Sequence, residues 1–437
     1  MDQEERQRGG DDAVSVPRFN FQRLKVISPL GRGAKGVVFL VKDQETEELM
    51  ALKVISKDLI HRKGKDGGDG DEYRRVCFEQ QVLRRFDHPL LPKLHGVLDT
   101  EKLVGYAINY CPGRDLNSLR KRQTERMFSD DVIRFYAAEL VLALEYLHGL
   151  GVVYRDLKPE NVMIQENGHI MLVDFDLSTK LSPSVKTPQP APRSNSVSKS
   201  ASVHKNNKTK KKRSSLFHSF CNSGISPDDF NAPAETETSA KPDNRTDSDT
   251  SGKSNSFVGT EEYVAPEIIT AKGHGFEVDW WSLGVLLYEM LYGTTPFRGS
   301  NRKETFYRIL TKAPELTGEA TPLRDLIKNL LEKDPKQRIG LDEIKGHEFF
   351  RGIRGRWDSV AQLPRPPYIP EEVGEGTDGN KKIDVESVVE GIFGNGGGEE
   401  ENKNNHKYEQ EENVNKRVWK EEPNHHHPTQ PDAFSVF

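Results

Sequence analysis

Cysteine is scarce in this chain of 437 residues, which has only three, at Cys77, Cys111 and Cys221. Three widely spaced thiols supply neither a disulfide framework nor a zinc cluster, and they favour a reducing intracellular compartment. No run of 18 apolar residues occurs, so no membrane-spanning helix is predicted, and the first ten residues are too polar for a secretory signal. We therefore expect an intracellular protein, in the cytoplasm and, from a basic run described below, in the nucleus or at the cell periphery.

Apolar residues are also few, at 34%, whereas 30% of the residues are charged and 25 are prolines. This composition predicts that the core is concentrated in part of the chain. Residues 1–20 form a predicted disordered tail, and the Ser-, Pro-, Lys-, Asn- and Thr-rich stretch at about 181–254 is a predicted disordered insert. We place one folded domain at 21–350, interrupted by this insert, and a C-terminal tail at 351–437.

Strand-like patterns dominate the start of the predicted domain. Residues 21–30, 36–43 and 49–55 are apolar runs separated by Gly-rich or polar turns, which is typical of an antiparallel meander. A short helix over the sheet is expected at 75–86, where apolar residues recur on one helical face. We predict a small antiparallel sheet in this part of the chain.

Helical patterns dominate the rest. Residues 129–148 carry apolar side chains at helical spacing, with Ser129 as the N-cap and acidic residues in the first turn. Two further helices are expected at 279–293 and 323–334. The sequence therefore predicts an α+β fold with two lobes, a small antiparallel-sheet N-lobe and a larger helical C-lobe.

Three glycines follow the first predicted strand in the spacing G-x-G-x-x-G-x-V. Because Gly31, Gly33 and Gly36 have no side chains, backbone N–H groups there can approach the phosphates of a nucleotide closely. A strand follows them where a dinucleotide-binding fold needs a helix, which disfavours that fold, whereas an ordinary hairpin turn remains an alternative. The candidate nucleotide-binding residues of this segment are Leu30, Gly31, Arg32, Gly33, Ala34, Lys35, Gly36, Val37 and Val38.

One lysine, Lys53, lies within the apolar run ALKVI. An unpaired ammonium group in such a strand is costly, so Lys53 is predicted to meet phosphate oxygens and a carboxylate. Glu79, on the helix that follows, is the candidate carboxylate. The alternative is a solvated lysine at the edge of a strand.

The segment YRDLKPEN, residues 154–161, brings together three chemically useful side chains. Asp156 can orient a hydroxyl group and accept its proton, Lys158 can stabilise phosphate charge, and Asn161 can bind magnesium. Asp174, behind apolar residues downstream, suits a Mg²⁺ ion that bridges phosphates. The catalytic candidates are therefore Lys53, Glu79, Asp156 and Lys158, and the metal-binding candidates are Asn161 and Asp174.

These motifs, in this order, resemble the eukaryotic protein kinase family. Three further matches are Ala265-Pro266-Glu267 at the end of the activation segment, Asp279, which braces the catalytic loop, and Arg338, which pairs with Glu267. The resemblance implies transfer of the γ-phosphoryl group of ATP to protein serine or threonine, with ATP and Mg²⁺ as cofactors. It places Asp115 at the nucleotide ribose and Ile108 at the gatekeeper position. Because every catalytic group is present, an inactive pseudokinase scaffold is disfavoured.

Within this family the chain is similar to the AGC group and to its plant AGC VIII subfamily. Tyr154 stands where many kinases have histidine, and GTEEYVAPE at 259–267, RPPYIP at 365–370 and a terminal F-x-x-F are typical of the group. The insert and Asp176, which replaces the usual glycine of D-F-G, are typical of the subfamily and imply a signalling role, with oxidative stress or defence as candidate contexts. A positive φ at Asp176 would cost about 1 to 2 kcal/mol. We therefore expect fewer flips of the activation loop, without loss of catalysis.

The resemblance also assigns two carboxylates to substrate recognition. Glu160 and Glu289 match residues that bind arginines before the target serine, so basic protein substrates are expected. The alternative is that these carboxylates are solvated or pair with internal arginines.

Two regulatory elements are implied as well. Ser256 matches the activation-loop phosphosite, where a phosphate can pair with Arg155 and order the loop; a merely solvated serine is the alternative. Phe434 and Phe437 match a motif that docks on the helix bearing Glu79 and recruits a phosphoinositide-dependent kinase. Frayed aromatic residues at the chain end are the alternative.

The strongest local charge is the basic run KNNKTKKKR at 205–213. Importin binding, anionic-lipid binding and simple solubility are all open interpretations of this run. No stable nucleic-acid partner is expected, because the net charge is only −5 and no groove-reading element accompanies the run.

Overall fold

The computed structural model describes residues 16–33, 36–64, 71–181, 259–362 and 383–393. The chain divides into two units, residues 1–183 with 252–437 and residues 184–251. The second unit lies outside the described residues, so every element below belongs to the first. Among the described residues, no helix has the length and apolar character needed to cross a membrane.

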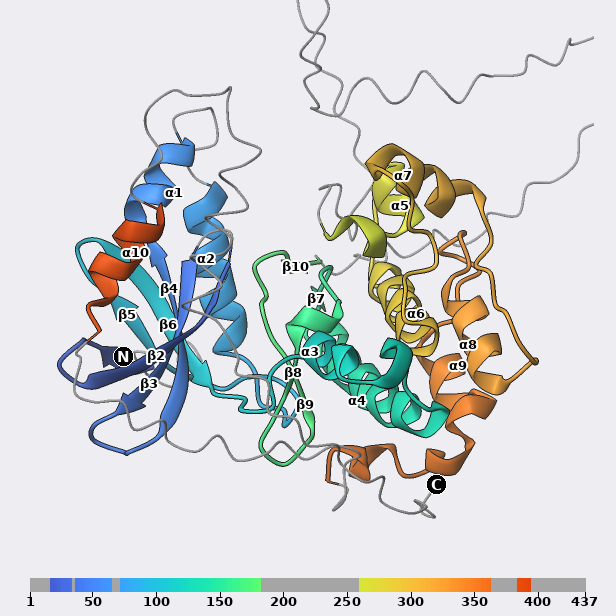
Figure 1. Ribbon diagram of the computed structural model, residues 1–437, viewed down its shortest axis with the longest axis horizontal. Coiled ribbons are helices and arrows are strands. Elements are labelled where there is room, and N and C mark those ends of the chain that lie inside the picture. Colours follow the sequence, from blue (N-terminus) through green and yellow to red (C-terminus); the bar gives the residue numbers. More distant parts are fainter. Residues whose placement is uncertain (1–15, 34–35, 65–70, 182–258, 363–382, 394–437) are drawn as a thin grey trace, which may run out of the picture. The chain divides into compact units, whose positions relative to one another are not determined.

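A six-stranded sheet forms the N-terminal lobe, in the order β1-β5-β6-β4-β3-β2 (Figure 1). Neighbouring strands are antiparallel except β1 and β5, which are parallel. The strands are β1 (Arg18–Phe19), β2 (Leu24–Arg32), β3 (Gly36–Asp43), β4 (Leu49–Ser56), β5 (Leu94–Asp99) and β6 (Leu103–Asn109). The consecutive antiparallel pairs β2·β3 and β3·β4 confirm the predicted meander.

Helices cover both faces of this sheet. They are α1 (Lys57–Gly64), α2 (Asp71–Leu83) and α10 (Val385–Phe393). Successive residues of a strand point to opposite faces. Ile55 of β4 packs with Ile60 of α1 and Val76 of α2 on one face, whereas Leu52 belongs to the apolar cluster that holds Val389 of α10 on the other. The sheet is therefore enclosed between α1 and α2 on one side and α10 on the other.

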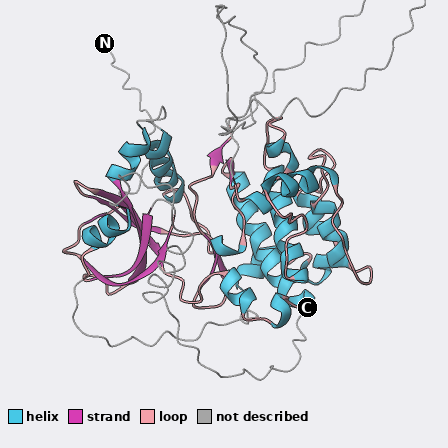
Figure 2. Ribbon diagram, turned by 45° about the horizontal axis from the view of Figure 1, so that its top comes forward, coloured by secondary structure: helices cyan, strands magenta, loops and turns pink. Residues whose placement is uncertain are grey.

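The C-terminal lobe is built around two long buried helices, α4 (Asp130–Gly149) and α6 (Glu277–Tyr292). Figure 2 shows that helices dominate this lobe, whereas most strands lie in the other. The side chain of Ser129 accepts a hydrogen bond from the backbone N–H of Val132, which confirms the predicted N-cap of α4. On α6, a Cβ atom at Gly284 would lie 2.8 Å from the Cβ of Leu330, so glycine allows α6 and α8 to pack closely.

Shorter elements complete this lobe. The helices are α3 (Leu116–Lys121), α5 (Pro266–Ile269), α7 (Arg302–Thr311), α8 (Pro322–Leu330) and α9 (Leu341–Gly346), with 3-10 turns at Thr124–Arg126, Pro159–Asn161, Glu261–Tyr263, Glu348–Ile353 and Trp357–Gln362. The small strands are β7 (Val152–Val153), β8 (Val162–Ile164), β9 (Ile170–Leu172) and β10 (Thr179–Lys180). The β8·β9 hairpin and the β7·β10 pair flank the segments that carry Asp156 and Asp174.

The folded part extends beyond both predicted boundaries. Phe19, within the predicted tail, is buried in β1. Past the predicted end of the domain at residue 350, Trp357 and Val360 join the core of the helical lobe, and α10 lies within the predicted C-terminal tail. Each of these segments buries only a few apolar side chains, and it does so against a part of the chain that is distant in sequence. Composition alone therefore does not distinguish them from a tail.

Candidate active site

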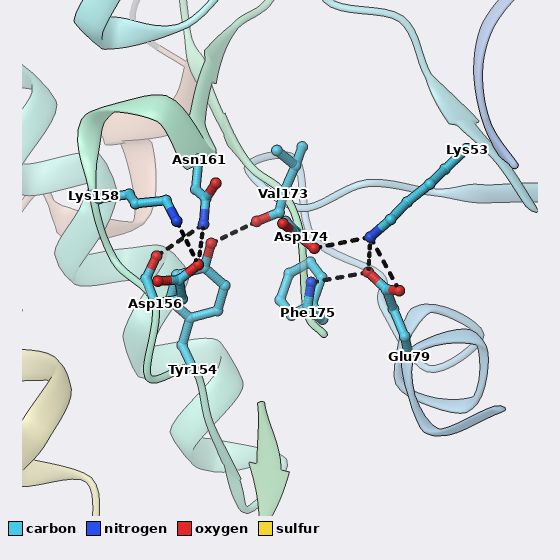
Figure 3. Close-up of polar contacts among 9 residues, drawn as sticks. All are labelled: Lys53, Glu79, Tyr154, Asp156, Lys158, Asn161, Val173, Asp174 and Phe175. Carbon is cyan, nitrogen blue, oxygen red and sulfur yellow. Dashed lines mark hydrogen bonds and ion pairs between the residues drawn. The ribbon is translucent and has the colours of Figure 1, made fainter. Parts of the chain in front are cut away.

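Lys53 of β4 lies between two carboxylates, as Figure 3 shows. Its Nζ is 3.1 Å from Oε1 of Glu79 and 2.9 Å from Oδ1 of Asp174. Burial opposes the charge on Lys53, but the attraction of Asp174 and Glu79 prevails and raises its pKa well above the usual value. Burial raises the pKa of Glu79, and Lys53 opposes this shift. The predicted pairing of Lys53 with Glu79 is present, and the ammonium group also joins α2 to the Asp174 segment.

Asp174 has an unusual backbone conformation, with a φ of 61°. The positive charge of Lys53 lowers its carboxyl pKa, so Asp174 is an anion ready to bind a cation. The next residue, Phe175, donates its backbone N–H to Oε1 of Glu79 at 3.1 Å. The expectation of a positive φ at Asp176 is wrong. Among the described residues, Asp174 has a positive φ and Asp176 does not. The strain assigned to the missing glycine is therefore absent in this conformation.

Asp156 is held by three donors at the centre of the catalytic loop, and two of them, Lys158 and Asn161, are drawn in Figure 3. Its Oδ2 accepts hydrogen bonds from Lys158 Nζ at 2.8 Å and from Asn161 Nδ2 at 2.9 Å. Its Oδ1 accepts from Oγ1 of Thr260 at 3.1 Å, and Thr260 also receives a hydrogen bond from Lys158. Asp156 is 6% exposed, so its carboxylate is largely shielded from water. The three hydrogen bonds fix the direction of this carboxylate. Sequence reasoning missed Thr260, although it lies in the GTEEY motif.

The described residues also fit a magnesium ion. Mg²⁺ prefers one or two carboxylates and completes its coordination with water or phosphate oxygens. Asp174 supplies a carboxylate, and Asn161 binds Asp156 through its Nδ2, which leaves the amide oxygen as the second donor. No group of three or more His, Cys, Asp or Glu side chains suited to a metal occurs within the described ranges. This donor set therefore suits a phosphate-bound Mg²⁺ rather than a closed structural site.

Asp279 of α6 holds the backbone of the catalytic loop. Its carboxylate accepts hydrogen bonds from the backbone N–H of Tyr154 at 2.9 Å and of Arg155 at 2.8 Å, and Nε2 of His148 lies 2.8 Å away. Arg155 has a φ of 69°, which L side chains rarely adopt. These contacts confirm the predicted brace and hold the loop in a strained turn.

The Gly-rich segment forms the end of the β2·β3 hairpin. Gly31 pairs with Val38 across the strands, and the N–H of Gly33 donates to the carbonyl of Gly36 at 2.8 Å. A Cβ atom at Gly36 would lie 2.3 Å from the Val54 carbonyl oxygen, so this glycine is required by strand packing. Among the described residues, nothing lies within 4 Å of the Cβ position of Gly31, so packing does not require a glycine there.

The structure also places other candidate nucleotide-binding residues, some in this hairpin and some outside it. Leu30 and Arg32 are exposed, Val37 is buried and Val38 is half-buried. Ile108 of β6 is half-buried and pairs with Ala51 of β4. The carboxylate of Asp115 caps α3 by accepting hydrogen bonds from the N–H and Oγ of Ser118, both at 2.8 Å.

The two carboxylates assigned to substrate recognition differ. Glu289 lies 2.9 Å from the guanidinium group of Arg120 and accepts a hydrogen bond from the Tyr263 hydroxyl. Glu289 therefore follows the alternative prediction of an internal arginine pair. Glu160 is exposed and accepts a hydrogen bond from Nδ2 of Asn117 at 2.9 Å.

Several predictions fall outside the described residues. They concern Ala34, Lys35, Ser256, Phe434, Phe437, the basic run at 205–213 and the RPPYIP segment at 365–370.

Tyr106 of β6 is a site residue that sequence reasoning missed. It is 2% exposed, pairs with Lys53 across the strands, and its ring centre lies 5.6 Å from Nζ of Lys53. Its hydroxyl group interacts with the Glu79 carboxylate and opposes the rise that burial causes in the pKa of that group. A tyrosine within an apolar strand gives no sequence signal for this contact, because its partner is on another element.

Tyr106→Phe is expected to lower the free energy of unfolding by about 1 to 2 kcal/mol, because the buried Glu79 carboxylate loses its favourable interaction with the hydroxyl group. It should also lower kcat more than it raises KM for ATP, since Glu79 positions Lys53. Thermal unfolding and steady-state kinetics measure both effects. Tyr307→Phe is the matched control, because Tyr307 is 55% exposed on α7. Equal behaviour of the two variants would contradict a positioning role for Tyr106.

Comparison with known proteins agrees with this geometry. A family model described as a protein kinase domain matches residues 24–200 and 240–350. The chain is 63% identical over 390 residues, 88% of each chain, to serine/threonine-protein kinase OXI1 of Arabidopsis thaliana. It is 42% identical over 376 residues to serine/threonine-protein kinase UCN of the same plant, covering 80% of this chain and 85% of UCN. It is 36% identical over 433 residues to serine/threonine-protein kinase AGC1-7, covering 88% and 71% of the two chains.

Proposed function

The chain belongs to the protein kinase family and to its AGC group of serine/threonine kinases, and from this premise we propose which residues bind Mg²⁺-ATP and transfer its γ-phosphoryl group. The Gly-rich hairpin from Leu30 to Val38 covers the phosphates, with Ile108 and Asp115 at the adenine and ribose ends. Lys53, fixed by Glu79, pairs with the phosphates. Asn161 and Asp174 hold Mg²⁺, which neutralises phosphate charge when bound.

Asp156 is the proposed catalytic base. The carboxylate orients the hydroxyl group of the protein substrate and accepts its proton as the phosphoryl group is transferred. Lys158 stabilises charge on the transferred group, and Thr260 keeps Oδ1 of Asp156 in place. The observation that carries this assignment is the fixed direction of the Asp156 carboxylate, which has donors on both oxygens.

Calorimetry of nucleotide binding tests the proposed metal and nucleotide roles. We expect a non-hydrolysable ATP analogue to bind the wild type with Mg²⁺ and to bind at least tenfold more weakly with EDTA. Asp174→Asn should abolish that difference, because the proposed Mg²⁺ site loses its anionic ligand and keeps only neutral amide oxygens. Asp358→Asn, a change of the same kind at an exposed 3-10 turn, is the control. Binding that does not depend on Mg²⁺ in the wild type would contradict the proposal.

The proposed substrates are proteins with basic residues before the target serine or threonine. The exposed carboxylate of Glu160 supports this preference, whereas Glu289 already pairs with Arg120. By similarity to the AGC group, phosphorylation of Ser256 would pair with Arg155 and activate the enzyme.

Proposed partners and location follow from the same similarity. Phe434 and Phe437 recruit a phosphoinositide-dependent kinase, and the run at 205–213 binds an importin or anionic lipid. The enzyme would act in the cytoplasm, the nucleus or at the cell periphery, in oxidative-stress or defence signalling. The insert that carries the basic run interrupts the proposed kinase domain at 21–350, and the tail that carries Phe434 and Phe437 follows this domain.

A further inference from the structure

The exposed carboxylate of Glu160 lies on the same loop as the proposed base, Asp156. The next residue, Asn161, donates its Nδ2 to the carboxylate and to the backbone carbonyl of Asp156, both at 2.9 Å. The backbone at Glu160 is therefore fixed relative to the base. The long side chain of Glu160 has several rotatable bonds, so its direction depends on a further contact.

Asn117 of α3 supplies that contact. Its Nδ2 donates to Oε1 of Glu160 at 2.9 Å, and its Oδ1 accepts from Nη2 of Arg120 at 3.0 Å. An arginine side chain has donors and no acceptor, so the amide oxygen of Asn117 must face Arg120 and its nitrogen must face Glu160. Asn117 is half-buried and therefore presents a donor, in one orientation, to the carboxylate.

The guanidinium group of Arg120 is itself held by buried partners. Arg120 is 7% exposed, and its Nη1 donates to the carbonyl of Gly293 at 3.0 Å. Its Nη2 also lies 2.9 Å from Oε1 of Glu289, whose carboxylate accepts a hydrogen bond from the Tyr263 hydroxyl. The guanidinium group is therefore anchored to the buried end of α6, which fixes the amide beside it.

Repulsion between two carboxylates makes the amide contact important. Burial raises the pKa of Glu289, and the negative charge of Glu160 adds to this rise, so the two carboxylates repel each other. The amide donor of Asn117 attracts Glu160 and offsets this repulsion. Loss of the amide should therefore release the side chain of Glu160 as well as free its Oε1.

Asn117 leaves one oxygen of Glu160 fully free for a ligand. Oε1 accepts from Asn117, whereas Oε2 has no hydrogen-bond partner within the described ranges. An arginine binds a carboxylate best through two parallel N–H···O bonds, which need both oxygens, whereas a lysine ammonium is a point charge that one oxygen can bind. The usual advantage of arginine over lysine therefore depends on an oxygen that Asn117 already uses.

We propose that Asn117 determines which cation Glu160 accepts from a protein substrate, and that this site takes lysine as readily as arginine. Asn117 is a positioning residue, since it directs the carboxylate and occupies the oxygen that a second arginine hydrogen bond would use. The inference rests on the proposed function, in which Glu160 binds a basic residue before the target serine or threonine. Glu289 takes no part in this choice, because Arg120 already pairs with it.

The test measures kcat/KM of the full chain for three peptides that differ at one position before the target serine, which is arginine, lysine or alanine. The position used is the one at which Glu160→Gln has its largest effect. The wild type should phosphorylate the arginine and lysine peptides with efficiencies within about threefold of each other. Asn117→Leu should prefer the arginine peptide by about three- to tenfold, because both oxygens are then available for charge-assisted hydrogen bonds.

A matched control and a double variant separate this effect from a structural one. Asn329→Leu removes a contact of the same kind, from the amide of Asn329 to the carboxylate of Asp325 on α8, and should leave the ratio of the two efficiencies unchanged. Asn117→Leu combined with Glu160→Gln should give the same ratio as Glu160→Gln alone, because the carboxylate that Asn117 directs is gone. Thermal unfolding checks that each variant is folded.

The ratio of arginine to lysine efficiencies decides the outcome. The same ratio in the wild type, Asn117→Leu and Asn117→Ala would overturn the inference, and so would a wild type that prefers arginine by more than about tenfold. If Glu160→Gln treated the three peptides as the wild type does at every position, the proposed preference for basic substrates would be wrong. The inference would then fall with it.

Discussion

Asp156→Asn is expected to lower kcat by about 10²- to 10⁴-fold, the usual contribution of a general base. The amide has the size of the carboxylate but does not accept the proton of a substrate hydroxyl group. It can still accept a hydrogen bond through its remaining oxygen, from Lys158 or from Thr260. The fold and nucleotide binding should therefore be retained while phosphoryl transfer is lost.

Incorporation of labelled phosphate into a basic protein substrate measures this loss, and thermal unfolding monitors the fold. Asp342→Asn is the matched control, because it makes the same change in charge at an exposed position in the first turn of α9. A variant that kept more than a tenth of the wild-type kcat would show that Asp156 is not the base. Loss of activity together with unfolding would show that the residue is structural.

Arg338→Met should be the most destabilising of the substitutions considered, with a decrease of about 3 to 5 kcal/mol in the free energy of unfolding. Arg338 and Glu267 form a pair with distances of 2.6 and 3.0 Å, and their side chains are 0% and 4% exposed. Removal of the guanidinium group leaves the carboxylate of Glu267 buried and without its charge partner. Arg338 also donates to the carbonyls of Glu277 and Glu332, so α6 loses a further contact.

Denaturant unfolding of Arg338→Met and of a double variant, Arg338→Met with Glu267→Leu, measures the effect. The double variant should recover part of the stability, because it removes the unpaired charge. Arg351→Met is the control for the loss of an ion pair, since Arg351 and Glu348 are 79% and 53% exposed and should contribute less than about 1 kcal/mol. Equal losses for Arg338→Met and Arg351→Met would contradict the role of burial.

The sequence predicted the elements whose cause is local. The meander of β2, β3 and β4 follows from short apolar runs separated by turns, and α4 begins at the predicted Ser129 because a hydroxyl there caps the helix. The pairing of Lys53 with Glu79 followed from the cost of a buried charge, which requires a partner wherever it lies. The roles of Asp156, Lys158, Asn161 and Asp174 came from family motifs and remain for mutagenesis to test.

Other features could not be predicted because their cause is distant in sequence. Helix α10 is stabilised by burial against the sheet, whereas its own composition is that of a tail. For Glu289 the sequence left a substrate contact and an internal arginine pair open, and it could not identify Arg120, on another helix, as the partner. Strain was expected at Asp176 because glycine usually occupies this position of the motif. The positive φ lies instead two residues earlier, at Asp174.

The brace at Asp279 links the catalytic loop to the core of the helical lobe. Its carboxylate accepts hydrogen bonds from the backbone N–H groups of Tyr154 and Arg155 from within the buried helix α6. The direction of the neighbouring Asp156 therefore depends on the packing of α6. Damage to the core of this lobe would lower phosphoryl transfer even where every side chain proposed to take part in it is intact.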